Sequence, residues 1–146
     1  MGIGDSIMAD DIQQYPPKKL TAASQVEMEA NSLTTVYTSP GAEKYHPGTA
    51  KAWAVFCGTR TLNIEGNYNV SGVTDMKTGL YQFGFTTAFS STFYVVATSA
   101  HDGGARPLIM GVHSKSASTI QLEVENYAGS AADCKYGNFI VFGDFA

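Results

Sequence analysis

The sequence has few charged residues, and its cations do not cluster. Charged side chains make up 15% of the 146 residues, whereas an average soluble domain has about 25%. The formal net charge is -4, and the nine Lys and Arg residues form no stretch that would follow a phosphate backbone. Nucleic acid is therefore not an expected partner.

Long hydrophobic runs are also missing. The first twenty residues place three aspartates among isolated apolar side chains, so they lack the continuous apolar core of a signal peptide. No other window approaches the roughly 18 uninterrupted apolar residues of a membrane-spanning helix. We expect the protein to fold in a cytosol and not to insert into a membrane.

Only two cysteines are present, Cys57 and Cys134, and neither has a second Cys or a His beside it at the spacing of a zinc site. In a chain that folds in a reducing compartment, such residues are usually small buried hydrophobes. A disulfide that forms late is the alternative. No metal site and no cofactor is expected.

Catalytic motifs are missing as well. The sequence has no nucleophile elbow and no phosphate-binding loop. Glu123 and Glu125 stand two residues apart, but strand alternation already explains them as a solvated face. His46, His101 and His113 occur in unrelated contexts, and solvated or hydrogen-bonded side chains are their expected state. The sequence does not predict an enzyme.

Aromatic and β-branched side chains are abundant, and after residue 50 they follow a period of two. In the clearest run, Ile120, Leu122 and Val124 alternate with polar residues. About seven such runs are separated by Gly, Asn, Asp and Ser turns. The pattern predicts an all-β fold, an antiparallel, jelly-roll-like β-sandwich, as a head domain over residues 51–146.

Three finer expectations concern single strands. The run "KAWAVFCG" is apolar on both faces, so both faces should be covered. Residues 61–65 and 68–75 should pair as a hairpin that turns at residues 66–67. The run "LYQFGFTTAF" places its aromatic side chains on one face, and Gly84 on the other face marks a bulge or a close approach.

The first fifty residues do not follow the strand pattern. A Pro-Pro pair at residues 16–17 favours an extended chain. Either Thr21 or Ser24 can cap a short helix here, and Ser24, with Glu27 three residues later, has the capping-box pattern. Besides Met28 and Ala30, Val26 is the only clear apolar anchor of this helix, and Asn31 is a residue at which it can end.

Two Pro-Gly pairs, at residues 40–41 and 47–48, predict turns that bracket a short polar segment. Because this region buries too little to fold alone, residues 1–50 are expected to form a docking and oligomerisation arm. The arm should meet the head at a hinge made of Tyr45, His46, Pro47, Gly48 and Trp53. If Trp53 is buried there, its replacement by Ala should cost about 3–5 kcal/mol.

The chain holds eight Phe, eight Tyr and one Trp, more than a small sandwich must bury. Either the single core is thick, or an outer surface is covered by partner subunits. The arm favours the second alternative, because an extended segment with no surface of its own suits wrapping between subunits.

Two loops are candidates for recognition, because rigid strands present variable side chains through the loops between them. The loops "AHDGGARP" and "YAGSAADCKY" combine aromatic and short polar side chains, which suits a carbohydrate ligand. The candidate ligand-binding residues are His101, Asp102, Arg106, Tyr127, Asp133, Lys135 and Tyr136. An ordinary loop that binds nothing is the alternative at residues 101–104.

An ordered series of short elements resembles a segment of tailed-bacteriophage tail fibre and related virion proteins. The series contains an acidic stretch, a Pro-Gly turn, a "YHP…AKAW" element, an "NVSGVTD…TG…Y" run and a Phe-Thr-Thr strand. In this chain the elements occupy Glu27–Ala30, Pro40–Gly41, Tyr45–Pro47, Ala50–Trp53, Asn69–Asp75, Thr78–Gly79, Tyr81 and Phe85–Thr87. The resemblance covers about Glu27–Phe89 and, more loosely, Val141–Gly143.

The resemblance implies a homotrimeric virion protein, assembled in the host cytoplasm, whose arm binds other virion proteins and whose head contacts a host-surface glycan or protein. Similar proteins often carry this segment at the end of a much longer fibre, so the short chain favours a short spike or a fibre tip. An architectural protein without a receptor role, such as a head decoration, head fibre or tail adaptor, is the alternative. A glycan-degrading spike would need clustered carboxylates, which the sequence does not show.

Overall fold

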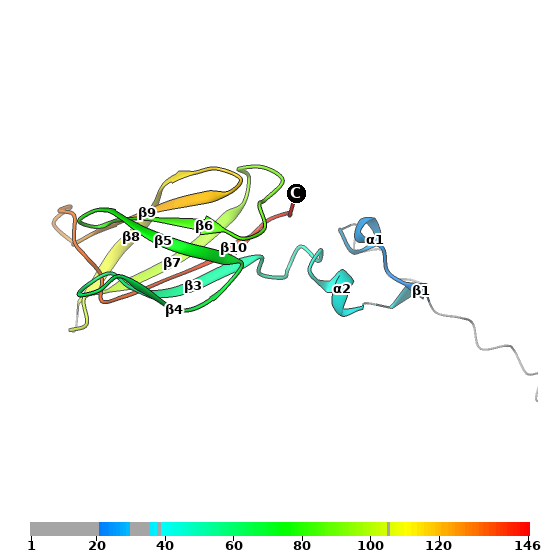
Figure 1. Ribbon diagram of the computed structural model, residues 1–146, viewed down its shortest axis with the longest axis horizontal. Helices are drawn as coiled ribbons and strands as arrows, with labels where there is room; N and C mark the ends of the chain where they lie inside the picture. Colours follow the sequence, from blue (N-terminus) through cyan, green and yellow to red (C-terminus); the bar gives the residue numbers. More distant parts are fainter. Residues whose placement is uncertain (1–20, 30–35, 38, 105) are drawn as a thin grey trace, which may run out of the picture.

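The computed structural model describes residues 21–29, 36–37, 39–104 and 106–146. Within these ranges two short helices and two very short strands precede the eight strands of the head (Figure 1). In chain order the elements are β1 (Thr21–Ala22), α1 (Gln25–Glu29), β2 (Val36–Tyr37), α2 (Pro40–Glu43), β3 (Ala52–Cys57), β4 (Asn63–Tyr68), β5 (Val70–Lys77), β6 (Leu80–Phe85), β7 (Val95–His101), β8 (Pro107–Lys115), β9 (Thr119–Glu125) and β10 (Tyr136–Phe142).

The eight head strands form one antiparallel sheet in the order β4-β3-β10-β7-β8-β9-β6-β5. Strands β7 and β8 pair only at Ala100 with Leu108 and at His101 with Pro107. At this short contact the sheet folds over, so that β4-β3-β10-β7 forms a first layer and β8-β9-β6-β5 a second layer (Figure 1). The predicted all-β antiparallel sandwich is confirmed, as a nearly closed sheet.

Aromatic side chains from both layers fill the core. Phe56 of β3 packs edge-to-face on Tyr81 and Phe83 of β6, with ring centroids 5.2 and 4.9 Å apart. Phe83 packs in the same way on Phe139 of β10, at 4.8 Å. Such pairs add about 0.5–1.5 kcal/mol each beyond the burial of their area. Part of the aromatic surplus therefore belongs to a single core.

The alternation predicted for residues 120–124 and the close approach predicted at Gly84 are both confirmed. Ile120, Leu122 and Val124 of β9 are fully buried, as their alternation predicts. Gly84 is a close approach, because a Cβ at this residue would lie 2.7 Å from Oγ of Ser71. The pairing of β5 with β6 also shifts register beside Ser71, as in a β-bulge.

The turn predicted at residues 66–67 is wrong. Both residues continue β4, where they pair with β3. The chain turns instead at Asn69, with a φ of 57°, and asparagine is among the few residue types other than glycine that adopt such angles readily. The side-chain amide of Asn69 exchanges hydrogen bonds of 3.0 and 2.6 Å with the backbone of Thr87. These bonds fix the corner between the layers.

The capping box of the arm helix is confirmed. The backbone N–H of Ser24 donates to the carboxylate of Glu27 at 2.9 Å, and the N–H of Glu27 donates to Oγ of Ser24 at 3.3 Å. The hydrogen bonds from Ser24 hold the pKa of Glu27 below its usual range. The predicted start of α1 is therefore correct to within a residue.

Of the apolar anchors predicted for this helix, Met28 is confirmed and Val26 is wrong, and Ala30 lies outside the described residues. Val26 is exposed, whereas Met28 is buried in a small cluster with Ala23 and Ala42. The expected helix end at Asn31 and the Pro-Pro pair at residues 16–17 lie outside the described residues.

The turn predicted at residues 40–41 is the start of a helix. Pro40 occupies the first turn of α2, and Oγ of the N-cap residue Ser39 accepts a hydrogen bond from Ala42 N at 3.3 Å. Proline is favoured at this position because it has no N–H to leave unpaired. None of the helices in the described ranges has the length and apolar character needed to span a bilayer.

Candidate functional site

The arm meets the head through a tight turn. Thr49 N donates to the carbonyl oxygen of His46 at 3.0 Å, which places Pro47 and Gly48 at the centre of a β-turn. Gly48 N donates to Nδ1 of His46 at 3.0 Å. Tyr45, just before the turn, packs against the small apolar cluster of the arm. The turn predicted at residues 47–48 is confirmed.

A buried lysine lies at this junction, and sequence reasoning missed it. The side chain of Lys51 is only 1% exposed, and its Nζ donates to His46 O at 2.7 Å. Its backbone N–H donates to Val141 O at 2.8 Å, which joins the end of the arm to β10. Burial lowers the pKa of Lys51, while Asp144 and Glu29 act in the opposite direction. Because lysine is rarely buried, its position in the sequence gives no warning of this role.

Trp53, predicted to pin the hinge, is not buried. It is 39% exposed on the outward face of β3, where its indole lies above Gly66 of β4, 3.5 Å from where a Cβ would be. The condition for a loss of 3–5 kcal/mol is therefore not met, and the expectation that both faces of β3 are covered is wrong for this chain alone. Core-facing Phe56 is the buried aromatic residue of β3.

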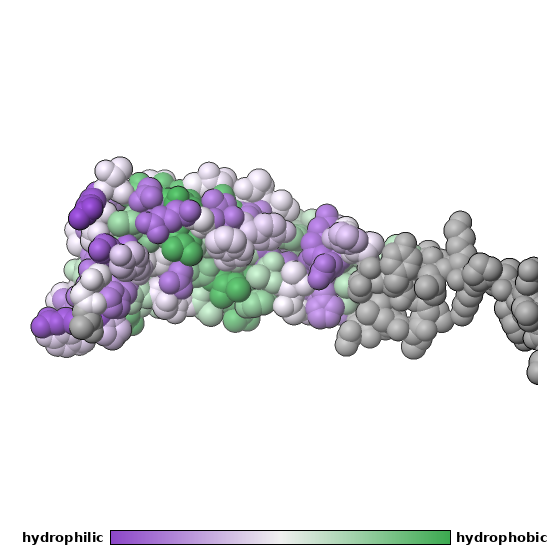
Figure 2. Space-filling view, turned by 90° about the horizontal axis from the view of Figure 1, so that it is seen from below, coloured by the Kyte–Doolittle hydropathy of each residue, from purple (hydrophilic) through white to green (hydrophobic). Residues whose placement is uncertain are grey.

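The two candidate loops lie together at the end of the head away from α2 (Figure 1). Lys135 N donates to His101 O at 2.9 Å, and the rings of His101 and Tyr136 have centroids 6.4 Å apart. Nζ of Lys135 lies 5.0 Å from the centroid of the Tyr136 ring. Hydrophilic side chains gather at this end of the molecule (Figure 2). We name residues 101–107 and 126–136 the tip.

A cleft of about 400 Å³ lies at the opposite end of the head from the tip, and a smaller one of about 270 Å³ lies within the tip. The tip cleft contains four of the seven candidate residues. Its lining is Asp102, Arg106, Pro107, Leu108, Asn126, Tyr127, Ala128, Ala132 and Asp133. Ligand pockets usually measure about 300–1,000 Å³, so the tip cleft is smaller than most of them.

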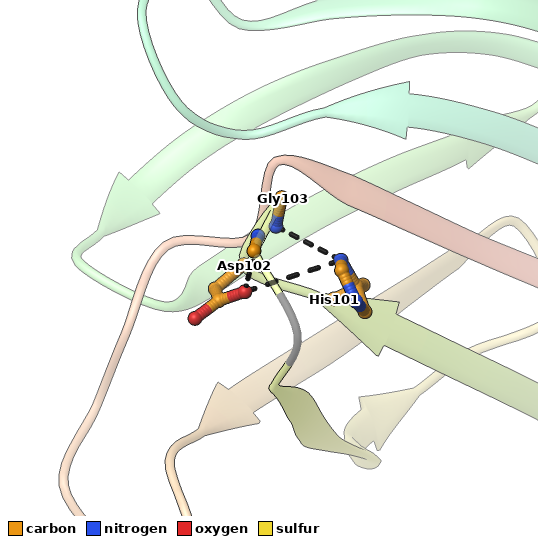
Figure 3. Close-up of polar contacts among 4 residues, drawn as sticks. His101, Asp102 and Gly103 are labelled. Carbon is orange, nitrogen blue, oxygen red and sulfur yellow. Dashed lines mark hydrogen bonds and ion pairs between the residues drawn. The ribbon is translucent and has the colours of Figure 1, made fainter.

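The side chains of the first tip loop fold back on their own backbone (Figure 3). Gly103 N donates to Nδ1 of His101 at 2.9 Å, and Gly104 N donates to Oδ1 of Asp102 at 2.7 Å. Nδ1 of His101 lies 4.0 Å from Oδ1 of Asp102. An Nδ1 that accepts a hydrogen bond places the ring proton on Nε2 in neutral histidine.

Asp133 has a structural contact that the sequence does not reveal. Its Oδ1 accepts hydrogen bonds from Gly79 N at 2.8 Å and from the Tyr81 hydroxyl at 2.9 Å. Burial, and secondly this bond to Asp133, raise the pKa of Tyr81. The carboxylate ties the tip to the turn between β5 and β6, more than fifty residues earlier in the chain, so local sequence carries no signal for it.

The larger cleft, which we name the arm cleft, was not predicted. Its lining is Lys44, Tyr45, Tyr68, Asn69, Thr86, Thr87, Phe145 and Ala146. These residues come from the end of α2 and the hinge, from the end of β4 and the corner after it, from the segment after β6 and from the last residues of the chain. Because the cleft depends on how these distant segments meet, no local pattern could have indicated it.

The cysteines are free thiols, and only one is fully buried. Burial raises the pKa of Cys134 to about 11, which fits its expected state as a small buried hydrophobe. Cys57 is half-buried, and its Sγ lies 3.1 Å from Thr59 O. Across the part of the chain that the structure describes, no three His, Cys, Asp or Glu side chains gather to hold a metal ion.

Comparisons with known proteins assign no family to this chain. No family model, no curated protein and no solved structure matches it. The structure defines the fold class. It is an all-β antiparallel sandwich, and two short helices precede β3, the first strand of the sandwich.

Proposed function

We propose that the protein is a structural component of a tailed-bacteriophage virion, a tail fibre or short spike subunit whose β-sandwich head contacts the host surface. The observation that carries the proposal is that the two ends of the head differ. The arm segment joins one end of the head, and both candidate loops lie together at the other end (Figure 1). An appendage that attaches by one end and recognises a surface by the other needs this arrangement. The resemblance of residues 27–89 to virion proteins supplies the phage context.

The tip has groups that suit a glycan. Tyr127 is 78% exposed and lines the same cleft as Arg106 and Asp102. Aromatic rings pack on the C–H groups of a sugar, and charged side chains bond its hydroxyls. A cleft this small binds one sugar weakly, but several copies on one particle raise the effective affinity. A homotrimer, as the resemblance implies, would present three tips.

We infer a binding role and not a catalytic one. The carboxylates near the tip already have partners, since Asp133 accepts from Tyr81 and Oδ1 of Asp102 accepts from the loop backbone. On the second layer, Glu123 pairs with His113 at 3.1 Å. Acid–base catalysis on a glycan needs two carboxyl groups that face one substrate, and these contacts favour structural uses instead.

A different observation favours the architectural alternative, a head decoration, head fibre or tail adaptor. Trp53 and Tyr68 stand side by side on the outward face of the first layer, 39% and 45% exposed. Exposed aromatic side chains of this kind suit contact with other proteins of the particle. In this role the tip would not bind a host receptor.

The first experiment locates the protein on intact particles with antibody-gold labelling in the electron microscope. Label at the tail tip or fibres supports host contact. Label over the capsid overturns the receptor role and leaves the architectural one.

The second experiment asks whether the purified protein competes with infection. The wild-type chain should reduce plaque counts, and Tyr127→Ala should lose this effect. Phe93→Ala is the matched control, because Phe93 is 92% exposed and precedes β7 at the end of the head away from the tip. Equal competition by both variants would rule out the tip as the contact surface.

A further inference from the structure

The first tip loop holds a reactive pair of residues that ligand binding does not use. Asp102 precedes Gly103, and the chain has no other Asp-Gly pair and no Asn-Gly pair. An aspartyl carboxyl group can react with the backbone nitrogen of the next residue to form a five-membered cyclic imide. Glycine hinders this attack least, because it has no Cβ. The sequence therefore contains one position at which the reaction meets little steric resistance.

The loop holds the two reacting groups close together. Oδ1 of Asp102 accepts a hydrogen bond from Gly104 N at 2.7 Å, in the turn that an aspartate side chain forms with the backbone two residues on. The ring closed by this bond includes the nitrogen of Gly103, so the carboxyl carbon of Asp102 is kept near the nitrogen that attacks it. The side chain of Asp102 is 36% exposed, so water has access to the group.

A proton acceptor lies at the attacking nitrogen. Gly103 N donates to Nδ1 of His101 at 2.9 Å (Figure 3). An amide nitrogen must give up its proton as it attacks, and a neutral imidazole nitrogen within hydrogen-bond distance is a general base for this transfer. The same Nδ1 lies 4.0 Å from Oδ1 of Asp102. His101 is therefore close to both reacting groups.

We propose that Asp102 is a site of spontaneous isomerisation, in which His101 takes the proton from the nitrogen of Gly103. Asp102 reacts as the neutral acid. The nitrogen of Gly103 forms a bond to Cγ while its proton passes to Nδ1, and the N–H of Gly104 stabilises the negative charge that develops on Oδ1. Nδ1 then returns the proton to the hydroxyl group on Cγ, the bond between Cγ and that hydroxyl breaks, and one water leaves.

Hydrolysis of the imide completes the reaction. One water adds to either carbonyl carbon of the ring. Attack at Cγ restores aspartate, whereas attack at the backbone carbonyl carbon gives isoaspartate, in which the main chain runs through Cβ and Cγ. The composition of the chain is unchanged, and water is the sole co-reactant. Because the main chain gains one atom at a residue that lines the tip cleft, an aged molecule has a different tip from a new one.

The inference does not depend on the phage context or on host contact, because it rests on the contacts among residues 101–104. The test incubates the full chain for several weeks in neutral buffer at physiological temperature. Digestion and electron-transfer fragmentation then measure isoaspartate at each aspartate, since this fragmentation distinguishes two linkages of equal mass. We expect isoaspartate to accumulate at residue 102.

Two controls accompany this measurement. Asp133 is the internal control, because Cys134 follows it and its Oδ1 accepts hydrogen bonds from Gly79 N and the Tyr81 hydroxyl. We expect little isoaspartate there. Asp102→Glu is the variant control, since a glutamyl carboxyl group would have to close a six-membered ring, which forms far more slowly. Signal at residue 102 in this variant would mean that the assay does not report the imide.

His101→Gln tests the proton transfer. A glutamine side chain can accept the hydrogen bond but cannot take the proton, so we expect the folded variant to form isoaspartate about tenfold more slowly than the wild type. Synthetic peptides of residues 98–108, with His or Gln at position 101, lack the fold and should isomerise at similar rates. Gly103→Ala is a poor probe, because its Cβ would overlap Cδ of Lys135 and its φ would be 89°.

Two results would overturn the proposal. An aged wild-type chain without isoaspartate at residue 102 would show that the loop prevents the reaction. Equal rates in the folded wild type and His101→Gln, or the same slowing in the peptides, would remove the His101 contact from the proton transfer. Circular dichroism shows whether each variant has folded, and His101→Asn takes the place of His101→Gln if that variant has not.

Discussion

The side-chain ammonium of Lys51 donates a hydrogen bond of 2.7 Å to the carbonyl oxygen of His46, across the turn at residues 47–48. The same carbonyl accepts the N–H of Thr49 at 3.0 Å. One oxygen therefore holds both the turn and the residue that leads into β3. The bond joins the last residues of the arm to the first residue of the head.

The first prediction concerns this bond. Lys51→Met keeps an apolar side chain and removes the ammonium. We expect the amide of Thr49 to exchange with solvent roughly tenfold faster, because losing a bond of about 1.4 kcal/mol raises the population of the open turn by that factor. The amide of Phe139 in β10 is the internal control and should exchange at an unchanged rate. Equal acceleration at both amides would mean that Lys51 stabilises the whole head and not the hinge.

The second prediction concerns the tight packing on the core side of β10. A Cβ on Gly137 would overlap the ring of Phe56 and approach Sγ of Cys134 at 2.9 Å. Gly137→Ala should therefore lower the free energy of unfolding by about 1–3 kcal/mol. Gly111 of β8 has no atom within 4 Å of that position, so Gly111→Ala should raise it by up to about 1 kcal/mol. Urea unfolding of both variants checks this, and similar losses in the two would contradict the difference in packing.

The sequence predicts the fold well because strand periodicity is a local signal. Ile120, Leu122 and Val124 alternate with polar residues, and all three are fully buried. The meeting of the two candidate loops also follows from the fold, since the loops after β7 and after β9 lie at the same end of a sandwich. The capping pattern of Ser24 and Glu27 is local as well, and it was found for that reason.

What the sequence did not predict depends on contacts between distant segments. Trp53 and Phe56 are both aromatic residues of β3, and only the layer packed on one side of the strand decides which of them is buried. Lys51 is buried because the arm turn covers it, and Asp133 has its bonds because a turn more than fifty residues earlier reaches it. No pattern within a single strand contains this information.

The third prediction separates the structural role of Asp133 from the rest of the tip. Asp133→Ala removes the acceptor for Gly79 and for the buried hydroxyl of Tyr81. We expect a loss of about 1–3 kcal/mol in the free energy of unfolding, because a buried donor is left without a partner. Asp102→Ala, at the exposed loop, should cost less than about 1 kcal/mol. In Tyr81→Phe the further effect of Asp133→Ala should shrink, and full additivity would show that the two residues do not interact.

The fourth prediction concerns stability at high pH, and its sign follows from three buried acids. Burial raises the pKa of Tyr94 to about 12 and that of Cys134 to about 11, and it also raises the pKa of Tyr81. In the unfolded chain these groups ionise near their ordinary values of 10 for Tyr and 9 for Cys. Above those values the unfolded chain binds fewer protons than the folded one, so stability falls as pH rises.

Lys51 acts in the opposite direction, because burial lowers its pKa. Between that lowered value and its ordinary value of 10.5, the unfolded chain binds more protons at this group, so this contribution to stability rises with pH. Three groups oppose one, and we expect the free energy of unfolding to be level between about pH 6 and 9 and to decline from there toward pH 12. Urea unfolding across this range measures the decline.

Tyr94→Phe tests whether the decline has this origin. The hydroxyl of Tyr94 donates to the carbonyl oxygens of Ser116 and Thr119, at 3.0 and 3.2 Å, so the variant should lose about 1 kcal/mol at neutral pH. Between pH 10 and 12, however, its stability should fall less steeply than that of the wild type, because one of the raised acids is gone. Tyr127→Phe, at the exposed ring of the tip, is the control and should keep the wild-type slope. A Tyr94→Phe slope equal to that of the wild type would show that Tyr94 ionises alike in the folded and unfolded chains, and that its burial does not govern the alkaline loss.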